Sequence, residues 1–481
     1  MSRGAVPGRF GPQGRKNPAR RGPGLPGTAV FRRCEQNVQR GRWKRGPMAL
    51  LQKVSPRVIS RSFLKSFLDF PGDTVAAGGA AERALSEVEL SVEKSRLVRR
   101  GRRSGWFRLL PAGVSAAVVL SAAGLLTGAW AAGKDAWPMY FRVPAHDTVT
   151  DEPLAPPLRV RWRYRTGGAV YSSPAVSEGR VFIGSHDGSM YALDASTGEL
   201  VWKFKTGGEI TSSPAVRDGV VYFGSKDRYV YAVGAADGEL VWKYRTRGKV
   251  VSSPVLAGDT LYIGSNDLKI HAVDTATGKK RWRVFLNDYR YGGVYSTPAY
   301  HDGVVYIASK NTRLYAFDAA TGDLLWAYAT GSAVYASPVV RDGVVYISSY
   351  DRSVYAVDAA TGELRWKTAL DDWIYATAVV YGDDLYVGTK GGYLTSLERS
   401  TGKIKFWFRL PSGISSTPVV TGDGFCYVGA EGGGLYGLNL KSGKIVWKGR
   451  TEGGVNSSPV LVDGILYVGD KAGVVYAFER E

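Results

Sequence analysis

The residues that could carry out nucleophilic, acid–base or metal chemistry in this 481-residue chain are few and scattered. The chain has two cysteines, Cys34 and Cys426, and four histidines, His146, His186, His271 and His301. The run Ser185-His186-Asp187 has the residue types of a hydrolase triad, but such triads converge from separated positions. We expect each histidine to be a solvated turn residue rather than a ligand, since most of them fall near predicted turns. The sequence therefore predicts no catalytic residues.

Metal and cofactor sites are also not indicated. The sequence contains no Asp-x-Asp-x-Asp run, which is the pattern typical of a calcium-binding loop. Only Cys426 follows the apolar segment described below, which excludes a cysteine-based zinc site in the C-terminal body. We expect no metal ligands and no bound cofactor.

Aromatic and charged side chains suggest recognition rather than catalysis. Two connections between predicted strands stand out, Asn287-Asp288-Tyr289-Arg290-Tyr291 and Asp371-Asp372-Trp373. Four tyrosines share one position of an internal repeat: Tyr171, Tyr295, Tyr335 and Tyr375. Aromatic residues flanked by charges suit a peptide, a sugar or an exposed β-edge. The alternative is that these tyrosines pack between repeat units, with their hydroxyls reaching water at the rim.

The elements that must position these residues come from a repeat of about 40 residues. Its clearest part is an Asp-x-x-Thr-Gly turn, which ends at Gly198, Gly238, Gly278, Gly322, Gly362, Gly402 and Gly443. Four residues after each glycine comes an aromatic residue: Trp202, Trp242, Trp282, Trp326, Trp366, Phe406 and Trp447. A Ser-Ser-Pro-like element recurs at the same period and gives eight units. Such a period, with several strands in each unit, is typical of a β-propeller.

Each unit is predicted to hold four strands, as in 170–176, 180–185, 189–194 and 199–205, with the Ser-Ser-Pro element on the innermost strand. In the repeated turn, the Asp or Thr side chain can bond local backbone N–H groups, and glycine supplies a positive φ. We expect the repeat aromatics to pack against the neighbouring blade.

The ring is predicted to close through its ends. The last unit stops at Glu481 without an outer strand, whereas an unassigned strand at 158–166 carries Trp162 in the aromatic position. We expect this N-terminal strand to complete the eighth blade. The fold class is therefore an all-β, eight-bladed propeller of four-stranded blades over 158–481. Closure of the ring removes the exposed sheet edges that an open ring would leave.

The net charge of +20 belongs mainly to the N-terminal part of the chain. Residues 1–110 carry 24 Lys and Arg against seven Asp and Glu, so the body is nearly neutral and does not indicate nucleic-acid binding. We expect 1–108 to be a basic, mostly disordered extension. Residues 109–132 are expected to form a signal peptide or membrane anchor, and 133–157 a lead-in linker. An alternative is that translation starts near Val98, where an ordinary signal peptide would begin.

The Asp-x-x-Thr-Gly-x-x-x-Trp unit resembles the PQQ-like β-propeller repeat, and the stretch 137–152 resembles the lead-in of exported bacterial propellers of this type. Eight such blades occur in quinoprotein alcohol dehydrogenases and in the BamB family of outer-membrane assembly propellers. The dehydrogenases have long insertions, an adjacent cysteine pair, a calcium site and a catalytic aspartate, and this chain lacks the insertions and the pair. The BamB family consists of lipoproteins, and no lipid-attachment cysteine follows the apolar run here.

The resemblance implies a non-catalytic exported propeller, monomeric, that binds a protein or polymer partner in the periplasm or at the cell surface. It could be secreted or anchored to the inner membrane through 109–132. The alternative is a PQQ-dependent, calcium-containing alcohol dehydrogenase or a degenerate relative. A weaker alternative is the extracytoplasmic sensor of a signalling protein, although residues 1–108 contain no recognisable effector domain.

Overall fold

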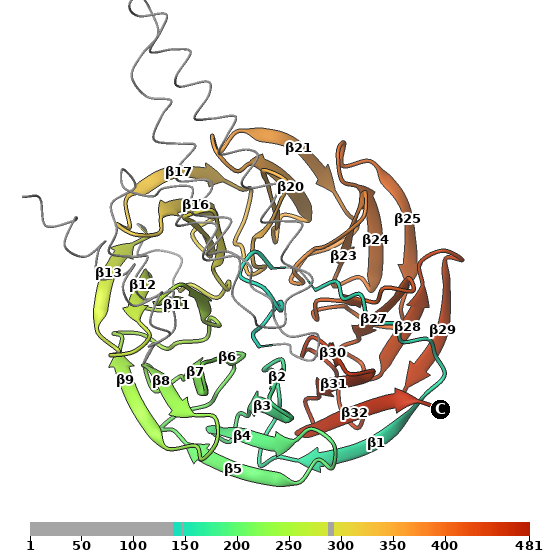
Figure 1. Ribbon diagram of the computed structural model, residues 1–481. Coiled ribbons are helices and arrows are strands. Elements are labelled where there is room, and N and C mark those ends of the chain that lie inside the picture. The colour runs from blue at the N-terminus through green and yellow to red at the C-terminus, as the bar shows by residue number, and fades with distance from the viewer. Residues whose placement is uncertain (1–137, 147, 287–292) are drawn as a thin grey trace, which may run out of the picture. The chain divides into compact units, whose positions relative to one another are not determined.

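The computed structural model describes residues 138–146, 148–286 and 293–481. These residues form eight four-stranded antiparallel sheets, the blades, arranged around a central axis (Figure 1). This confirms the predicted all-β, eight-bladed propeller. The expected basic extension (1–108) and the expected signal or anchor segment (109–132) lie outside the described residues. Within the described part of the chain, no helix is long and apolar enough to cross a membrane.

The first four blades follow one another along the chain. Blade 1 consists of β2 (Ala175–Ser177), β3 (Arg180–Gly184), β4 (Ser189–Asp194) and β5 (Leu200–Lys205). Blade 2 consists of β6 (Ala215–Arg217), β7 (Val220–Gly224), β8 (Tyr229–Gly234) and β9 (Leu240–Arg245). Blade 3 consists of β10 (Val255–Ala257), β11 (Thr260–Ser265), β12 (Lys269–Asp274) and β13 (Lys280–Phe285). Blade 4 consists of β14 (Ala299–His301), β15 (Val304–Ser309), β16 (Arg313–Asp318) and β17 (Leu324–Ala329).

The remaining blades complete the ring. Blade 5 consists of β18 (Val339–Arg341), β19 (Val344–Ser348), β20 (Ser353–Asp358) and β21 (Leu364–Ala369). Blade 6 consists of β22 (Val379–Tyr381), β23 (Asp384–Gly388), β24 (Tyr393–Glu398) and β25 (Ile404–Arg409). Blade 7 consists of β26 (Val419–Val420), β27 (Phe425–Gly429), β28 (Leu435–Asn439) and β29 (Lys444–Gly449). Blade 8 consists of β30 (Val460–Val462), β31 (Ile465–Gly469), β32 (Val474–Arg480) and β1 (Leu158–Arg165).

Blade 8 closes the ring as the sequence predicted. The N-terminal strand β1 pairs antiparallel with the C-terminal strand β32, from Leu158 opposite Arg480 to Arg165 opposite Val474 (Figure 1). Because one blade contains both ends of the propeller, neither β1 nor β32 is left as a separate strand with both edges free.

The innermost strands are shorter than predicted, because the Ser-Ser-Pro element precedes the strand instead of joining its ladder. Proline cannot donate a ladder hydrogen bond, and the serine hydroxyls take over the pairing. The Oγ of Ser172 accepts a bond from Gly184 N at 3.1 Å within the blade. The Oγ of Ser213 accepts a bond from Ser173 N of the preceding blade at 2.9 Å. The second type of bond is present at six of the eight blade junctions, including the junction from blade 8 to blade 1.

The repeated Asp-x-x-Thr-Gly turn joins the third strand to the outer strand and also joins neighbouring blades. Asp194 Oδ1 accepts bonds from the backbone N–H of Ser196 and Thr197, both at 2.9 Å, as expected for this turn. In the next blade, Gly238 has φ 73°, and a Cβ placed there would lie 2.8 Å from the Trp202 ring. Glycine is therefore required both for the turn and for the close approach of the aromatic ring.

The repeat tryptophans each bond to the next blade. Trp202 Nε1 donates to Ala235 O at 2.9 Å. The same bond is made by Trp162, Trp242, Trp282, Trp326 and Trp366, whereas Trp447 donates to Leu158 O of β1 in blade 8. Phe406 has no N–H to donate, and Gly443 of the following blade has no atom within 4 Å of its Cβ position. The hydrophobic core is accordingly divided into clusters between adjacent blades, such as the one that joins Phe182 and Trp202 to Phe223.

Residues 138–146 and 148–152, here called the strap, cross the axis of the propeller (Figure 1). Met139 forms a β-bridge with Ala215 of blade 2, and Val149 forms one with Val420 of blade 7. Between them, the carbonyls of Pro144 and Ala145 accept bonds from the inner strands of blades 4 and 5.

The strap is part of the folded interior. The side chains of Met139, Phe141 and His146 are at most 2% exposed. Residues 133–157 were expected to be a lead-in linker, and the described part of that segment instead packs into the propeller, which therefore begins before residue 158.

Candidate functional site

The two ends of the axis are covered by different connections. Antiparallel strands alternate in direction, so the turns between second and third strands share one face with the connections from each outer strand to the next inner strand. We call this the site face. The opposite face, which we call the strap face, carries the remaining turns. The strap joins the inner strands at residues such as Val216, Val340 and Val420, next to the turns of the strap face.

Two rings of half-buried residues surround the axis on the site face. The first ring follows the buried aliphatic residue that begins each inner segment, and its members are Tyr171, Thr211, Val251, Tyr295, Tyr335, Tyr375, Ser415 and Asn456. The second ring lies in the turns between second and third strands, and its members are His186, Lys226, Asn266, Lys310, Tyr350, Lys390, Glu431 and Lys471. The repeat places one residue of each ring in every blade. The aromatic and the charged members, however, are not spread evenly among the blades.

Aromatic residues gather in blades 4 to 6. Tyr335 and Tyr375 stack, with ring centroids 4.9 Å apart and an interplanar angle of 22°. Tyr295 meets Tyr335 edge-on at 5.5 Å. Tyr350 of the second ring lies 4.9 Å from Tyr335 and stacks on Trp373 at 5.3 Å and 19°. We call these five residues the aromatic cluster.

Trp373 is the most exposed member of the aromatic cluster, at 52%. Its loop is held by hydrogen bonds: Asp372 Oδ1 accepts from Trp373 N at 2.7 Å, and Trp373 O accepts from Lys390 N at 2.8 Å. Asp371 Oδ2 accepts from Thr389 Oγ1 at 3.1 Å. The ring is thus presented to solvent on a backbone that is already fixed.

Two lysines flank the cluster. Lys310 Nζ lies 5.4 Å from the ring centroids of both Tyr295 and Tyr335, and Lys390 Nζ lies 5.3 Å from that of Tyr375. Lys390 is also ion-paired with Glu431, which accepts a further bond from Ser415. Burial raises the pKa of the Glu431 carboxyl, but the bonds from Lys390 and Ser415 outweigh it and lower the pKa overall, so Glu431 stays ionised at neutral pH.

Four hydroxyls of the cluster have no hydrogen-bond partner among the residues that the structure describes. They are the hydroxyls of Tyr295, Tyr335, Tyr350 and Tyr375. Some tyrosines between blades are bonded, as Tyr262 is to Ala319 O at 2.9 Å. Burial, followed by the proximity of other tyrosines, raises the pKa of Tyr375, so its hydroxyl is protonated and can donate.

The residues proposed from the sequence are partly brought together. Tyr295, Tyr335, Tyr375 and Trp373 lie in one cluster, with Asp371 and Asp372 in the supporting loop. Tyr171 belongs to the same ring position but stacks on His186 at 4.6 Å in blade 1 instead. Asp288, Tyr289, Arg290 and Tyr291 lie outside the described residues.

Sequence reasoning missed Tyr350, Lys310 and Lys390. They belong to the second ring, which varies from blade to blade. Each second-ring residue directly follows the buried residues at the end of the second strand. Alignment of the eight turns between second and third strands would therefore have identified this position.

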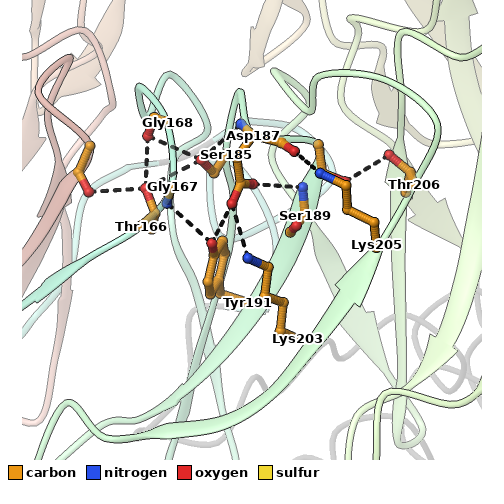
Figure 2. Close-up of polar contacts among 12 residues, drawn as sticks. Thr166, Gly167, Gly168, Ser185, Asp187, Ser189, Tyr191, Lys203, Lys205 and Thr206 are labelled. Carbon is orange, nitrogen blue, oxygen red and sulfur yellow. Dashed lines mark hydrogen bonds and ion pairs between the residues drawn. The ribbon is translucent and has the colours of Figure 1, made fainter.

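The run Ser185-His186-Asp187 does not form a triad, as expected. Ser185 Oγ donates to Gly168 O at 3.0 Å, and Asp187 Oδ2 accepts from Tyr191 and Lys203 (Figure 2). His186 Nε2 bonds Thr211 Oγ1 at 3.1 Å rather than either neighbour. Asp187 therefore joins the strands β4 and β5 of blade 1 and does not orient the imidazole.

Two histidines are buried, so the expectation that every histidine is a solvated turn residue was wrong. His271 is 1% exposed on β12 and bonds Asp267 Oδ1 and the Tyr244 hydroxyl, both at 3.1 Å. It occupies the position that Tyr191 has in blade 1, where the side chain points into the blade junction. His146 is 2% exposed in the strap. His186 and His301 are partly exposed, in and beside turns.

Under the alternative of a quinoprotein dehydrogenase, the resemblance implies an adjacent cysteine pair and a calcium site. Cys426, which has no adjacent cysteine, is buried between blades 6 and 7, where burial raises its thiol pKa. Over the described ranges, no three His, Cys, Asp or Glu side chains come together in a way that could hold a metal ion.

Comparisons with known proteins agree with the fold. BamB from Moraxella catarrhalis is 20% identical, with a TM-score of 0.59 over 67% of this chain and 100% of BamB. A europium-containing methanol dehydrogenase is 14% identical, with a TM-score of 0.64 over 72% of this chain and 98% of the enzyme. The quinohemoprotein alcohol dehydrogenase from Comamonas testosteroni is 16% identical, with a TM-score of 0.64 over 74% and 82%. Similarity at these identities shows the fold alone.

The sequence comparisons identify a family. No curated protein matches the chain. Residues 157–420, more than half of the chain, match the family described as "Beta-alanine-activating enzyme, beta-propeller". The predicted PQQ-like, BamB-like propeller is confirmed by this match and by the structural similarity to BamB. The chain belongs to the β-propeller family of the beta-alanine-activating enzyme.

Proposed function

We propose that this chain is a non-catalytic, extracytoplasmic propeller that binds a protein or polymer partner on its site face. The observation that carries the proposal is the aromatic cluster, in which Trp373 is 52% exposed on a fixed loop. Exposed Trp and Tyr side chains that are already held in place bind partners at a low entropic cost.

The structure supports a binding role in a second way. Side chains that elsewhere would perform chemistry are engaged in joining strands and blades, as Asp187 and His271 are. The fold similarity to BamB supports a scaffold. The extracytoplasmic location rests on the apolar segment at 109–132.

Photocrosslinking tests this proposal. We would place p-benzoylphenylalanine at Trp373 in the full-length chain, in its own host, and at Trp407 as the control. Trp407 is 58% exposed, also packs against a tyrosine, and lies on the outer strand β25. A protein partner would give a discrete band of lower mobility, and a polymer would give a broad one, from position 373 only. Equal products from both positions, or none from 373, would refute a partner on the site face.

The second candidate is a PQQ-dependent oxidoreductase, favoured by the similarity to the two alcohol dehydrogenases. We would incubate the protein with PQQ and calcium, separate it by gel filtration, and test dye reduction with simple alcohols. Stoichiometric quinone with alcohol-dependent reduction would establish this function and refute the non-catalytic one.

A further inference from the structure

We propose that the ligand of the aromatic cluster is an uncharged glycan chain, with one sugar ring stacked on Trp373. This inference rests on the proposed binding function and names the class of polymer.

The backbone of the site face is already paired. In seven blades, the second-ring residue donates its N–H to the carbonyl of the loop that enters the same blade, as Lys226 N does to Glu209 O at 2.9 Å and Tyr350 N to Ala333 O at 3.0 Å. A peptide that binds by strand addition needs free backbone donors and acceptors in a row. The second ring does not supply them, so recognition at this face depends on side chains.

Several charged side chains of the two rings are already engaged. Beside the cluster, Lys390 pairs with Glu431, and in blade 2 Lys226 pairs with Glu209 at 2.5 Å. Lys310 lies over two tyrosine rings, to which a cation is attracted by their π-electrons. A ligand with many charges would have to compete with these contacts, which favours a ligand without net charge.

What remains for a ligand is aromatic surface and hydroxyl groups. Tyr350 stacks on one face of Trp373 and lies edge-on to Tyr375, and the hydroxyls of both tyrosines have no partner among the described residues. A pyranose has an apolar C–H face for stacking and hydroxyls around its edge, so it matches both features.

The test is calorimetric titration of the full-length protein with four probes. Two are neutral β-linked hexasaccharides, cellohexaose and hexa-N-acetylchitohexaose; the third is hexagalacturonate, and the fourth is hexaglutamate. We expect a neutral hexasaccharide to bind, with an affinity that changes less than about twofold between about 0.05 and 0.5 M salt, because no ion pair is formed.

Variants assign the binding to the cluster. Trp373→Ala should weaken binding about tenfold, the equivalent of one aromatic stacking contact. Trp373→Phe should retain most of the affinity, and Trp407→Ala should leave it unchanged. Circular dichroism should show equal thermal unfolding for Trp373→Ala and the parent protein, since an exposed side chain is removed.

Three results would overturn the inference. Binding of hexagalacturonate alone, lost at high salt, would show that the ligand is anionic. Binding of hexaglutamate alone would indicate a protein partner. Absence of binding by every probe would also reject the glycan. In the last two cases, a crosslinked product at position 373, whether discrete or broad, would preserve the proposed function, and the absence of any product there would reject both.

Discussion

The strap makes the stability of the propeller depend on pH through one histidine. His146 is buried, and its Nδ1 bonds Pro338 O at 2.5 Å. Because a carbonyl can only accept, Nδ1 carries the proton of a neutral imidazole. The burial of the ring lowers the pKa of His146 from 6.5 to about 3. The ring packs on Phe141, at 4.3 Å between centroids, and its Nε2 has no hydrogen-bond partner among the described residues.

The sign and size of the effect follow from proton linkage. In the unfolded chain the imidazole takes up a proton below its ordinary pKa of 6.5, whereas in the folded protein it does so only near 3. Stability is therefore fully present above pH 6.5 and is lost as the pH falls towards 3. One extra proton in the unfolded state changes the free energy of unfolding by 1.4 kcal/mol per pH unit, or about 2 kcal/mol between about pH 6.5 and 4.5.

The perturbation is His146→Asn. Residue 146 has φ 69°, a conformation that asparagine adopts more readily than most residues, and its amide N–H could donate to the Pro338 carbonyl. Asparagine does not titrate. The variant should lose some stability at every pH because the ring no longer packs on Phe141, but it should lack the histidine-dependent slope.

The assay is urea unfolding of the full-length parent and variant proteins at several pH values. The carboxylates with lowered pKa values, such as Asp187 and Asp351, destabilise both proteins equally in acid, so only the difference between the two is informative. We expect that difference to shrink by about 2 kcal/mol from about pH 6.5 to 4.5. If the difference in the free energy of unfolding stayed constant with pH, His146 would titrate normally in the folded state, and the strap would not bury its ring in the propeller.

Three further outcomes are expected. Gly238→Ala should destabilise the fold by about 2–4 kcal/mol, because its Cβ would meet the Trp202 ring, whereas Gly219→Ala, with a similar φ and open space, should cost only about 1 kcal/mol. Equal losses in urea unfolding would contradict the role of the ring contact. Phe141→Ala should cost about 3–5 kcal/mol if the strap is part of the core, and a neutral result would place the strap outside it. In a Cys34→Ser variant, Cys426 should react with a disulfide reagent only at the rate of unfolding, and fast labelling of this folded variant would contradict its burial.

Much of the fold could be predicted because its signals are local. Alternating residues define each strand, the Asp-x-x-Thr-Gly turn depends on side chains within four residues, and the period counts the blades. The closure of the ring could also be predicted from the sequence. The last unit lacks an outer strand and the N-terminal segment supplies an extra one, so the two were expected to pair.

The candidate site could be predicted only in part. Tyr295, Tyr335 and Tyr375 share a repeat position, so their proximity followed from the ring itself. The stacking of Trp373 on Tyr350 did not, because it joins a loop entering blade 6 to a turn of blade 5.

The sequence by itself thus determined the number of blades, the order of strands and the way the ring closes, because each depends on contacts that recur at one period. Only the tertiary structure decided which turn residues meet across blades, that His271 takes the place of a tyrosine, and that the strap packs into the axis. These contacts join residues far apart along the chain, between segments that do not follow the repeat, and they form only when the ring brings all inner strands to one axis.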